Sequence, residues 1–489
     1  MNPVDYLRML RLAAPETIVT VTMLVVLAAD LTVLRGKSIA TRFQFGAFLA
    51  VLGCAAAAVF AFTRREQVDL LGGILIVDPG TDFIKVALLA LTIFTILIST
   101  GGKFTDHVGE YLSLILLGTI GLMFLVSAGD LLMIFISLEL ASLTLYILTA
   151  FNKRDARSGE AALKYFLFGG MSAAFLLFGF SLLYGLSGST NLTEVARQLA
   201  GKSHDPLVLV ALVMTVIGFG FKVAAVPFHL WAPDAYEGAP TPSAAFIGAG
   251  SKVASFFILA KILSVGFAGA EGSAVLHGYL AGWTPVVALV AALSMVLGNL
   301  TAIVQTNVKR LLAYSAIAHA GYMLLGVLSN TPASRSALMF YVVTYGLTVI
   351  GAFGVVTVVE EATGGAALKN FAGLSRRCPA LALCLLVFLL SLGGIPPLAG
   401  FIGKFFLFSA AVAAEPRDLG LLWLVILAIA MSAVSFYYYL RILKQAYVLD
   451  AAADAPAIKA PPLTLVALVA LAALVILLGC VPGLLTRFL

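Results

Sequence analysis

Charged side chains are scarce in this sequence. Asp, Glu, Lys and Arg make up 11% of its 489 residues, whereas a soluble domain contains about 25%. Hydrophobic residues reach 61%, and the mean hydropathy is +1.07. No soluble fold could keep this much apolar surface away from water. The composition therefore predicts a helical protein that crosses a membrane many times.

Patterns typical of cofactor sites are also missing. Cys54, Cys378, Cys384 and Cys480 show no CxxC or Cys/His spacing, which argues against iron–sulfur, zinc and disulfide frameworks. There is no GxGxxG stretch, no Walker loop and no soluble extension. The cations are scattered and form no basic stripe of the kind that binds nucleic acid. We expect this chain to bind no cofactor, metal or nucleic acid, so any redox chemistry would belong to partner chains.

Apolar stretches long enough to cross a bilayer core fill most of the sequence. A span needs about 20 residues, and by that measure we count about 14 transmembrane helices in one integral-membrane domain. They are expected near residues 13–34, 43–62, 81–100, 110–128, 131–151, 161–187, 206–228, 242–267, 281–304, 311–329, 337–360, 380–414, 419–440 and 463–482. The loops after odd-numbered spans carry more Lys and Arg than the others, which places them in the cytoplasm and both termini on the periplasmic side.

Two of these spans are predicted to be broken. In the stretch 206–228, Pro227 follows Lys222 by five residues, and proline lacks the N–H that a helix would use. The stretch 380–414 would measure about 50 Å as a straight helix, and Pro396 and Pro397 must interrupt it before Lys404. Paired broken helices are typical of inverted repeats around an ion site.

The broken spans suggest how the domain is divided. We predict an all-α polytopic fold that contains two inverted five-helix repeats, at residues 109–267 and 281–445. A three-helix segment at 1–108 precedes them, and a last helix at 463–489 follows.

Ionisable side chains recur inside the apolar stretches. A lysine at bilayer depth costs about 2.5–3.5 kcal/mol on insertion scales. The side chains that we single out at such depth are Glu139, Lys222, Lys252, His319 and Lys404. A row of titratable groups is what a proton or cation path requires. Lys85, Lys164 and Lys261 lie nearer the ends of their spans, so depth alone assigns them no role.

Partners within this row can be suggested from chemistry. A buried carboxylate needs a partner, and Lys222 is the most plausible one for Glu139. Lys252 stands among small residues that leave room for water or a close helix. His319 could relay between Lys252 and Lys404, although a single histidine on an apolar helix is often a hydrogen-bonded core residue.

One long segment resembles a known family. KVAAVPFHLWAPDAYEGAPTP, residues 222–242, is similar to a motif of the antiporter-like membrane subunits of respiratory complex I and of the Mrp cation/proton antiporters. Within that family, DAYEGAPTP and EAALKYFLFGG resemble the subunit N branch, because subunit M usually has DAH in the first motif. The long lateral helix of subunit L is not expected here.

The resemblance implies proton translocation across the bacterial inner membrane. Energy would come from NADH oxidation and quinone reduction in other subunits, which would hold the flavin, the iron–sulfur clusters, NADH and quinone. Antiporter-like subunit M, the small membrane subunits K, J and A, and indirectly the peripheral redox arm would be the partners.

The family also assigns roles by position. Glu139 and Lys222 would form a coupled ion pair, and Lys252 would be the central relay lysine. Lys404 would be the terminal lysine facing the outer exit, and His319 is similar to a polar relay position. Lys164 resembles a position near the site of cytoplasmic proton uptake.

Three other functions are alternatives. Two of them would use the same residues, and the third would use none of them. The chain could belong to an Mrp-type sodium or potassium/proton antiporter, or to a membrane-bound hydrogenase-type complex. It could also be a scaffold that only docks other subunits, in which case Lys222→Ala should be silent. An isolated secondary transporter is disfavoured because no solute-sized polar cluster appears.

Overall fold

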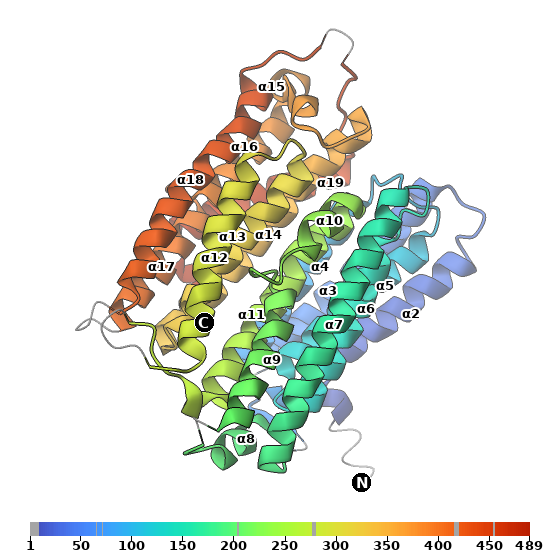
Figure 1. The fold of residues 1–489 in the computed structure, drawn as a ribbon. Coiled ribbons are helices and arrows are strands. Elements are labelled where there is room, and N and C mark those ends of the chain that lie inside the picture. The colour runs from blue at the N-terminus through green and yellow to red at the C-terminus, as the bar shows by residue number, and fades with distance from the viewer. Residues whose placement is uncertain are drawn as a thin grey trace.

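The structure is a computed structural model that describes residues 9–64, 66–70, 72–202, 205–275, 280–414, 420–452 and 455–489. Within these ranges the chain forms a bundle of long helices that run in roughly one direction (Figure 1). Among the described residues, twelve helices are long and apolar enough to cross a membrane. They are α2 (Ala14–Leu31), α3 (Ile39–Thr63), α4 (Pro79–Ser99), α5 (Val108–Ser127), α6 (Leu131–Thr149), α7 (Ala156–Ser187), α11 (Thr241–Lys261, continued by a π-helix Ile262–Gly266), α12 (Trp283–Ile303), α13 (Val308–Leu328), α14 (Pro332–Thr363), α18 (Leu422–Tyr447) and α19 (Pro462–Cys480).

Three shorter apolar helices lie where broken spans are predicted. They are α9 (Pro206–Lys222), α16 (Pro379–Gly393) and α17 (Ala399–Ala414). The helical membrane fold is thus confirmed, and the interruption within 380–414 falls beside Pro396 and Pro397 as expected. The inverted relation of the two repeats stays a prediction.

Several short elements were not predicted from the sequence. They are a two-stranded antiparallel hairpin of β1 (Val68–Leu70) and β2 (Leu75–Val77), α8 (Leu192–Gln198), α10 (Trp231–Gly238), a 3₁₀ turn Ala268–Ala270, another at Leu368–Phe371, α15 (Leu374–Arg377) and α20 (Gly483–Thr486). The sequence around α10 is rich in proline, which gives no indication of a helix. Pro233 is the third residue of α10, where its missing N–H would have no partner within the helix.

Polar residues fix where many of the helices begin. Ser38, Asp78, Asp130, Asn307 and Thr331 each accept a hydrogen bond from a backbone N–H in the first turn of the helix that follows. Each bond satisfies a donor that the helix itself leaves free. These capping residues therefore determine where their helices begin. The start of a helix in turn determines how deep each of its side chains lies.

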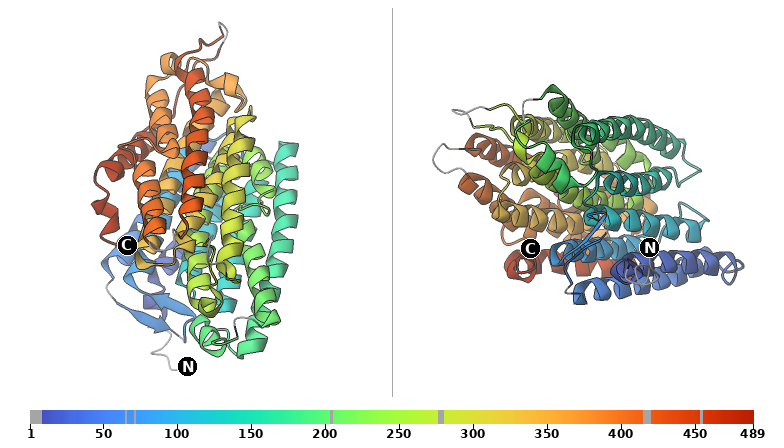
Figure 2. Two further views of the ribbon diagram at one scale, coloured as in Figure 1. Left: turned by 60° about the vertical axis from the view of Figure 1, so that its left-hand side comes forward. Right: turned by 90° about the horizontal axis from the view of Figure 1, so that it is seen from below.

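The N-terminal helices form one side of the bundle. In the view from below, the blue helices α2 and α3 lie along one edge of the bundle (Figure 2, right). The α4 helix packs on α11 and α14 and joins this edge to the rest. Phe488 at the other end of the chain stacks on Phe83 of α4 and meets Phe62 of α3. The beginning of α4 and the C-terminal residues thus share one end of the bundle.

The first broken helix, α9, ends at Lys222 rather than at Pro227. The N–H of Ala225 donates to the carbonyl of Gly220 at 2.8 Å, and the N–H of Ala224 donates to that of Phe221 at 3.0 Å. These two bonds are a Schellman motif, which requires a left-handed residue just beyond the helix. Ala224 takes that conformation, with φ +56°, where glycine is usual. A strained residue therefore stands two positions after Lys222.

The second broken helix, α16, ends in the same way. The N–H of Ile395 donates to the carbonyl of Leu390, and that of Gly394 to the carbonyl of Ser391, each at 3.0 Å. Gly394 has φ +92°, and an added Cβ there would lie 3.2 Å from Cδ of Lys404. Both the backbone and the nearby lysine therefore favour glycine at this position.

A cluster of four charges is buried in the N-terminal helices. Lys85 Nζ lies 2.7 Å from Glu16 Oε1 and 3.9 Å from Asp82 Oδ1, and Arg64 Nε donates to Asp82 Oδ2 at 2.9 Å. The side chain of Lys85 is fully buried and that of Glu16 is 1% exposed. The sequence position of Lys85 near the start of a span hid this burial, because its partner lies in another helix.

Removing one member of this cluster should destabilise the fold. Lys85→Met leaves the Glu16 carboxylate buried without its partner, which costs about 3 kcal/mol or more. We expect a lower thermal midpoint for the detergent-solubilised protein, measured by the loss of soluble tagged chain on heating. Arg11→Ala is the control, because its pair with Glu66 is exposed and should contribute little. An unchanged midpoint for Lys85→Met would contradict the proposed role of the pair.

Candidate functional site

The first group of buried polar side chains surrounds the end of α9. Lys222 Nζ lies 3.6 Å from Glu139 Oε1 of α6 and donates to Ser142 Oγ one turn further along α6. The rings of Tyr146 and Phe221 lie 5.9 and 5.4 Å from the same Nζ. The structure thus brings together Glu139 and Lys222, the two residues that the sequence paired.

Glu139 is the less buried partner, with 23% of its side chain exposed. It lies along a stripe of exposed apolar side chains of α6, formed by Leu132, Ile136, Leu143 and Ile147. A carboxylate that borders such a surface in a membrane is costly unless another protein covers it.

The break after Lys222 is held by an aromatic side chain. Trp231, the first residue of α10, donates from Nε1 to the carbonyl of Phe221 at 3.0 Å. Its ring stacks on Tyr165 of α7 with the centroids 4.1 Å apart. The position of Lys222 is therefore tied to α10.

The second group begins at Lys252 of α11, whose side chain is 2% exposed. Its Nζ donates to the carbonyl of Ala316 in α13 and lies 5.7 Å from the ring centroid of Tyr345 in α14. The same ring lies 4.9 Å from the imidazole of His319. Tyr345 therefore contacts both Lys252 and His319.

His319 is enclosed by tyrosines. Nδ1 lies 2.7 Å from the hydroxyl of Tyr341, and Nε2 lies 3.2 Å from that of Tyr439. The ring of Tyr322 lies 5.4 Å away on the third side. With both ring nitrogens in hydrogen-bonding distance of a hydroxyl, His319 has partners for either tautomer.

Lys404 of α17 binds backbone carbonyls that have no partner within α16, because that helix ends at the second break. Its Nζ donates to the carbonyls of Leu392 and Gly393 at 2.9 and 3.0 Å and to Ser432 Oγ of α18 at 2.7 Å. The same atom lies 5.1 Å from the ring centroid of Tyr322. Tyr322 therefore stands between His319 and Lys404 as Tyr345 stands between Lys252 and His319.

A groove of about 830 Å³ opens beside Lys404. It is lined mainly by apolar side chains of α17 and α18, such as Phe405, Val412, Ile429 and Phe436. Lys404 itself is 5% exposed, so its charged end lies at the bottom of the groove and not at the protein surface.

Side-chain contacts divide the predicted row into two groups, and the members of the second are joined through the rings of Tyr345 and Tyr322. Among the described residues, no direct hydrogen bond joins Lys222 to Lys252, or either of these lysines to His319 or Lys404. The first group contains Glu139 and Lys222, and the second contains Lys252, His319 and Lys404. Any proton that passes from one to the other has to cross a gap that water could fill.

Lys164 belongs to neither group. It lies on α7, and its Nζ lies 2.8 Å from both Asp234 Oδ2 of α10 and Glu160 Oε1. Asp234 also binds Arg310 of α13. Lys164 is 42% exposed, in contrast to the buried lysines of the two groups.

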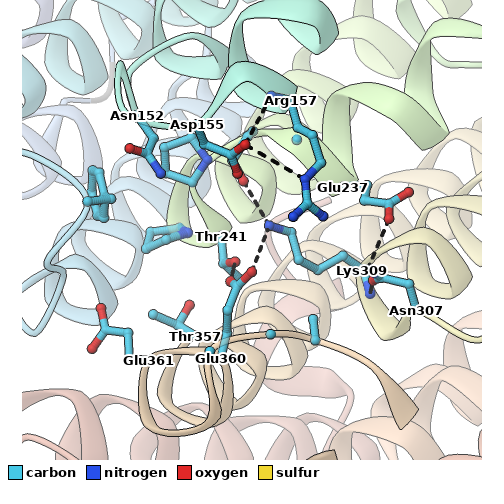
Figure 3. A pocket seen from close by; sticks show the side chains of 18 of the residues that line it. Asn152, Asp155, Arg157, Glu237, Thr241, Asn307, Lys309, Thr357, Glu360 and Glu361 are labelled. Carbon is cyan, nitrogen blue, oxygen red and sulfur yellow. Dashed lines mark hydrogen bonds and ion pairs between the residues drawn. The ribbon is translucent and has the colours of Figure 1, made fainter.

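A polar pocket of about 290 Å³ lies at the loop end of the bundle that we predict to be cytoplasmic (Figure 3). Lys309 crosses it, and its Nζ donates to the carbonyl of Ala239 at 2.9 Å and lies 3.4 Å from Glu360 Oε1. Thr241, the first residue of α11, donates to Oε2 of the same carboxylate. The pocket thus reaches the N-terminal end of the helix that carries Lys252.

Several residues around these groups were not found from the sequence. Ser142, Tyr341, Tyr345, Ser432 and Tyr439 all contact the predicted side chains. Each lies in an apolar helix, and its sequence context does not distinguish it from an ordinary core residue. The described residues contain no group of three or more His, Cys, Asp or Glu side chains that could hold a metal ion.

The chain matches a family model described as NADH:quinone oxidoreductase/Mrp antiporter, TM, over residues 128–433. It is 53% identical to NADH-quinone oxidoreductase subunit N 2 of Acidobacterium capsulatum, with all of both chains covered. It is 40% identical to NADH-quinone oxidoreductase subunit N of Moorella thermoacetica, with 90% of each chain covered.

Solved structures show the same fold. A chain of respiratory complex I from Thermus thermophilus is 33% identical, with a TM-score of 0.78 and coverage of 97% of this chain and 98% of that one. A chain of the Mrp complex from a Dietzia species has a TM-score of 0.83 at 20% identity, covering 98% and 96%, and is similar in fold. The matched residues 128–433 contain all five side chains of the two groups, and the chain belongs to the family of NADH:quinone oxidoreductase and Mrp antiporter membrane subunits.

Proposed function

We propose that this chain is the proton-translocating subunit N of a bacterial NADH:quinone oxidoreductase and performs no redox chemistry itself. The observation that carries the proposal is the pair of buried groups around the two helix breaks. Each group contains at least one lysine within a few residues of a break, and the relative named NADH-quinone oxidoreductase subunit N 2 matches the chain over its full length.

Charge would move through the chain in steps. A proton that reaches Glu139 weakens its attraction for Lys222, because the neutral carboxyl no longer balances the ammonium group. Lys252, at the end of the first predicted repeat, would then pass the charge to His319 and Lys404 in the second. The pocket around Lys309 and the side chain of Lys164 would serve proton uptake from the cytoplasm, and both termini would lie in the periplasm.

Partner subunits would supply the energy and the cofactors. Flavin, iron–sulfur clusters, NADH and quinone would be bound by other chains of the complex. The exposed apolar stripe of α6 beside Glu139 supports a membrane subunit as neighbour, because such a neighbour would keep the carboxylate away from lipid. Subunits M, K, J and A are the proposed membrane partners.

The assembly that contains this chain tests the proposal directly. The tagged chain would be extracted in mild detergent, and its partners identified by mass spectrometry alongside an NADH:quinone reductase assay. We expect flavin and iron–sulfur subunits together with reductase activity. Recovery with antiporter-like membrane subunits alone and no such activity would instead support an Mrp-type sodium or potassium/proton antiporter. Hydrogenase subunits would indicate a membrane-bound hydrogenase-type complex.

Breaking the first ion pair should reduce pumping. For Lys222→Ala and for Glu139→Ala we expect NADH-driven acidification of inverted vesicles to fall by about fivefold or more, which corresponds to a coupling of about 1 kcal/mol or more. The measurement is the initial rate of quenching of a pH-sensitive dye, normalised to the amount of assembled complex.

The exposed loop residue Lys202 provides a matched control. Lys202→Ala removes a lysine without touching either buried group and should pump like the parent. Normal pumping by both Lys222→Ala and Glu139→Ala would exclude the proposed role of the pair and would favour a scaffold.

A further inference from the structure

Five charged side chains form a continuous cluster where α7, α10 and α13 meet. The contacts run from Glu160 to Lys164, from Lys164 to Asp234, from Asp234 to Arg310 and from Arg310 to Glu237, at 2.8, 2.8, 2.6 and 3.1 Å. The cluster lies apart from the two buried groups and joins the first predicted repeat, through α7, to the second, through α13.

Asp234 is the member that two cations share. Its Oδ2 binds Lys164 of α7 and its Oδ1 binds Arg310 of α13, so each oxygen faces a different repeat. The carboxylate is 27% exposed, and the two cations are 42% and 31% exposed. The side chains of the cluster are thus partly exposed, and complete burial does not lock them in place.

The two cations hold α10 from opposite sides. Arg310 Nη1 lies 2.6 Å from Asp234 Oδ1 and 3.1 Å from Glu237 Oε2, so one guanidinium binds two carboxylates of α10. Lys164 Nζ binds Asp234 from α7 and is itself held by Glu160. Asp234 is therefore the carboxylate through which α10 is attached to both α7 and α13.

The short helix α10 is connected to α13 and to the first buried group. Glu237 accepts a hydrogen bond from Nδ2 of Asn307, the N-cap of α13, at 3.1 Å. At its other end, Trp231 holds the carbonyl of Phe221, the residue before Lys222. A displacement of α10 would therefore act on the break that positions Lys222.

The contact with α13 reaches the second buried group. Arg310 lies in the first turn of α13, and the same helix supplies the carbonyl of Ala316 to Lys252 and carries His319. The cluster is therefore in mechanical contact with Lys222 on one side and with Lys252 and His319 on the other.

We propose that Asp234 is a positioning residue that binds Lys164 and Arg310 at the same time, so that α10 couples the first predicted repeat to the second. This inference rests on the proposed proton-translocating function. It adds a link between the two groups, which no direct hydrogen bond among the described residues provides.

The test compares single and double variants in the intact complex. In inverted vesicles, the protons pumped per NADH oxidised are measured for Asp234→Asn, for Lys164→Met and for both together. We expect each single variant to lower this ratio by about fivefold, the lower end of the usual coupling between two sites. The double variant should be no worse than either single one, because both changes remove the same link.

Three further variants separate this link from a general loss of structure. Asp234→Glu keeps the charge and should restore at least part of the ratio. Arg310→Lys keeps the charge but removes the guanidinium that binds Asp234 and Glu237 together, and should lower the ratio even if Asp234→Asn fails to assemble. Asp30→Asn removes a carboxylate that also pairs with an arginine, Arg42, but lies in the N-terminal helices, and should leave the ratio of the assembled complex unchanged.

The outcomes that would overturn the inference are specific. They are a normal ratio for Asp234→Asn or Arg310→Lys, losses that multiply in the double variant, or an equal loss for Asp30→Asn. Lys222→Ala is measured in the same series. If it pumps normally, the proposed proton path fails. If it loses pumping while Asp234→Asn does not, only the role of Asp234 fails.

Discussion

Lipid offers no hydrogen bonds, so each polar group that lies deep in this bundle has to find its partner within the protein. Lys404 shows how the chain meets that constraint: two backbone carbonyls and a serine hydroxyl receive its three donors. Lys252 uses a carbonyl of a neighbouring helix, and Lys222 uses a carboxylate and a hydroxyl. The positions of Lys252 and Lys404 thus depend on backbone carbonyls, whereas that of Lys222 depends on side chains of α6.

The two helix breaks follow from the same constraint. A helix that ends inside the bundle leaves carbonyls without partners. Both breaks close with the same two backbone hydrogen bonds, and they differ in the side chain that binds a further carbonyl. At the first, the indole of Trp231 binds the carbonyl of Phe221. At the second, Lys404 takes that place beside Gly393. The breaks therefore provide structure and charge binding at once, which explains why prolines and lysines stand so close together in the sequence.

The sequence predicts those features that depend on local chemistry. Apolar length predicts the helices, proline predicts the breaks, and the cost of a buried carboxylate predicts that Glu139 meets Lys222. Features that depend on contacts between distant parts of the chain cannot be predicted in this way. Lys85 looked peripheral because its partner Glu16 belongs to another helix, and the helical form of α10 was hidden by its prolines. Tyr345 was missed for a further reason, since an aromatic ring in an apolar helix usually serves packing alone.

The gap between Lys222 and Lys252 has an electrical consequence. A resting membrane potential drives protons back into the cell with about 2.3 kcal/mol per 100 mV, and an unbroken chain of hydrogen bonds would conduct that leak. The rings of Tyr345 and Tyr322 face Lys252 and Lys404 and stabilise their charge, but an aromatic face accepts no proton. A proton that passes between the two groups therefore needs a further carrier such as water, and the leak is blocked whenever that carrier is absent.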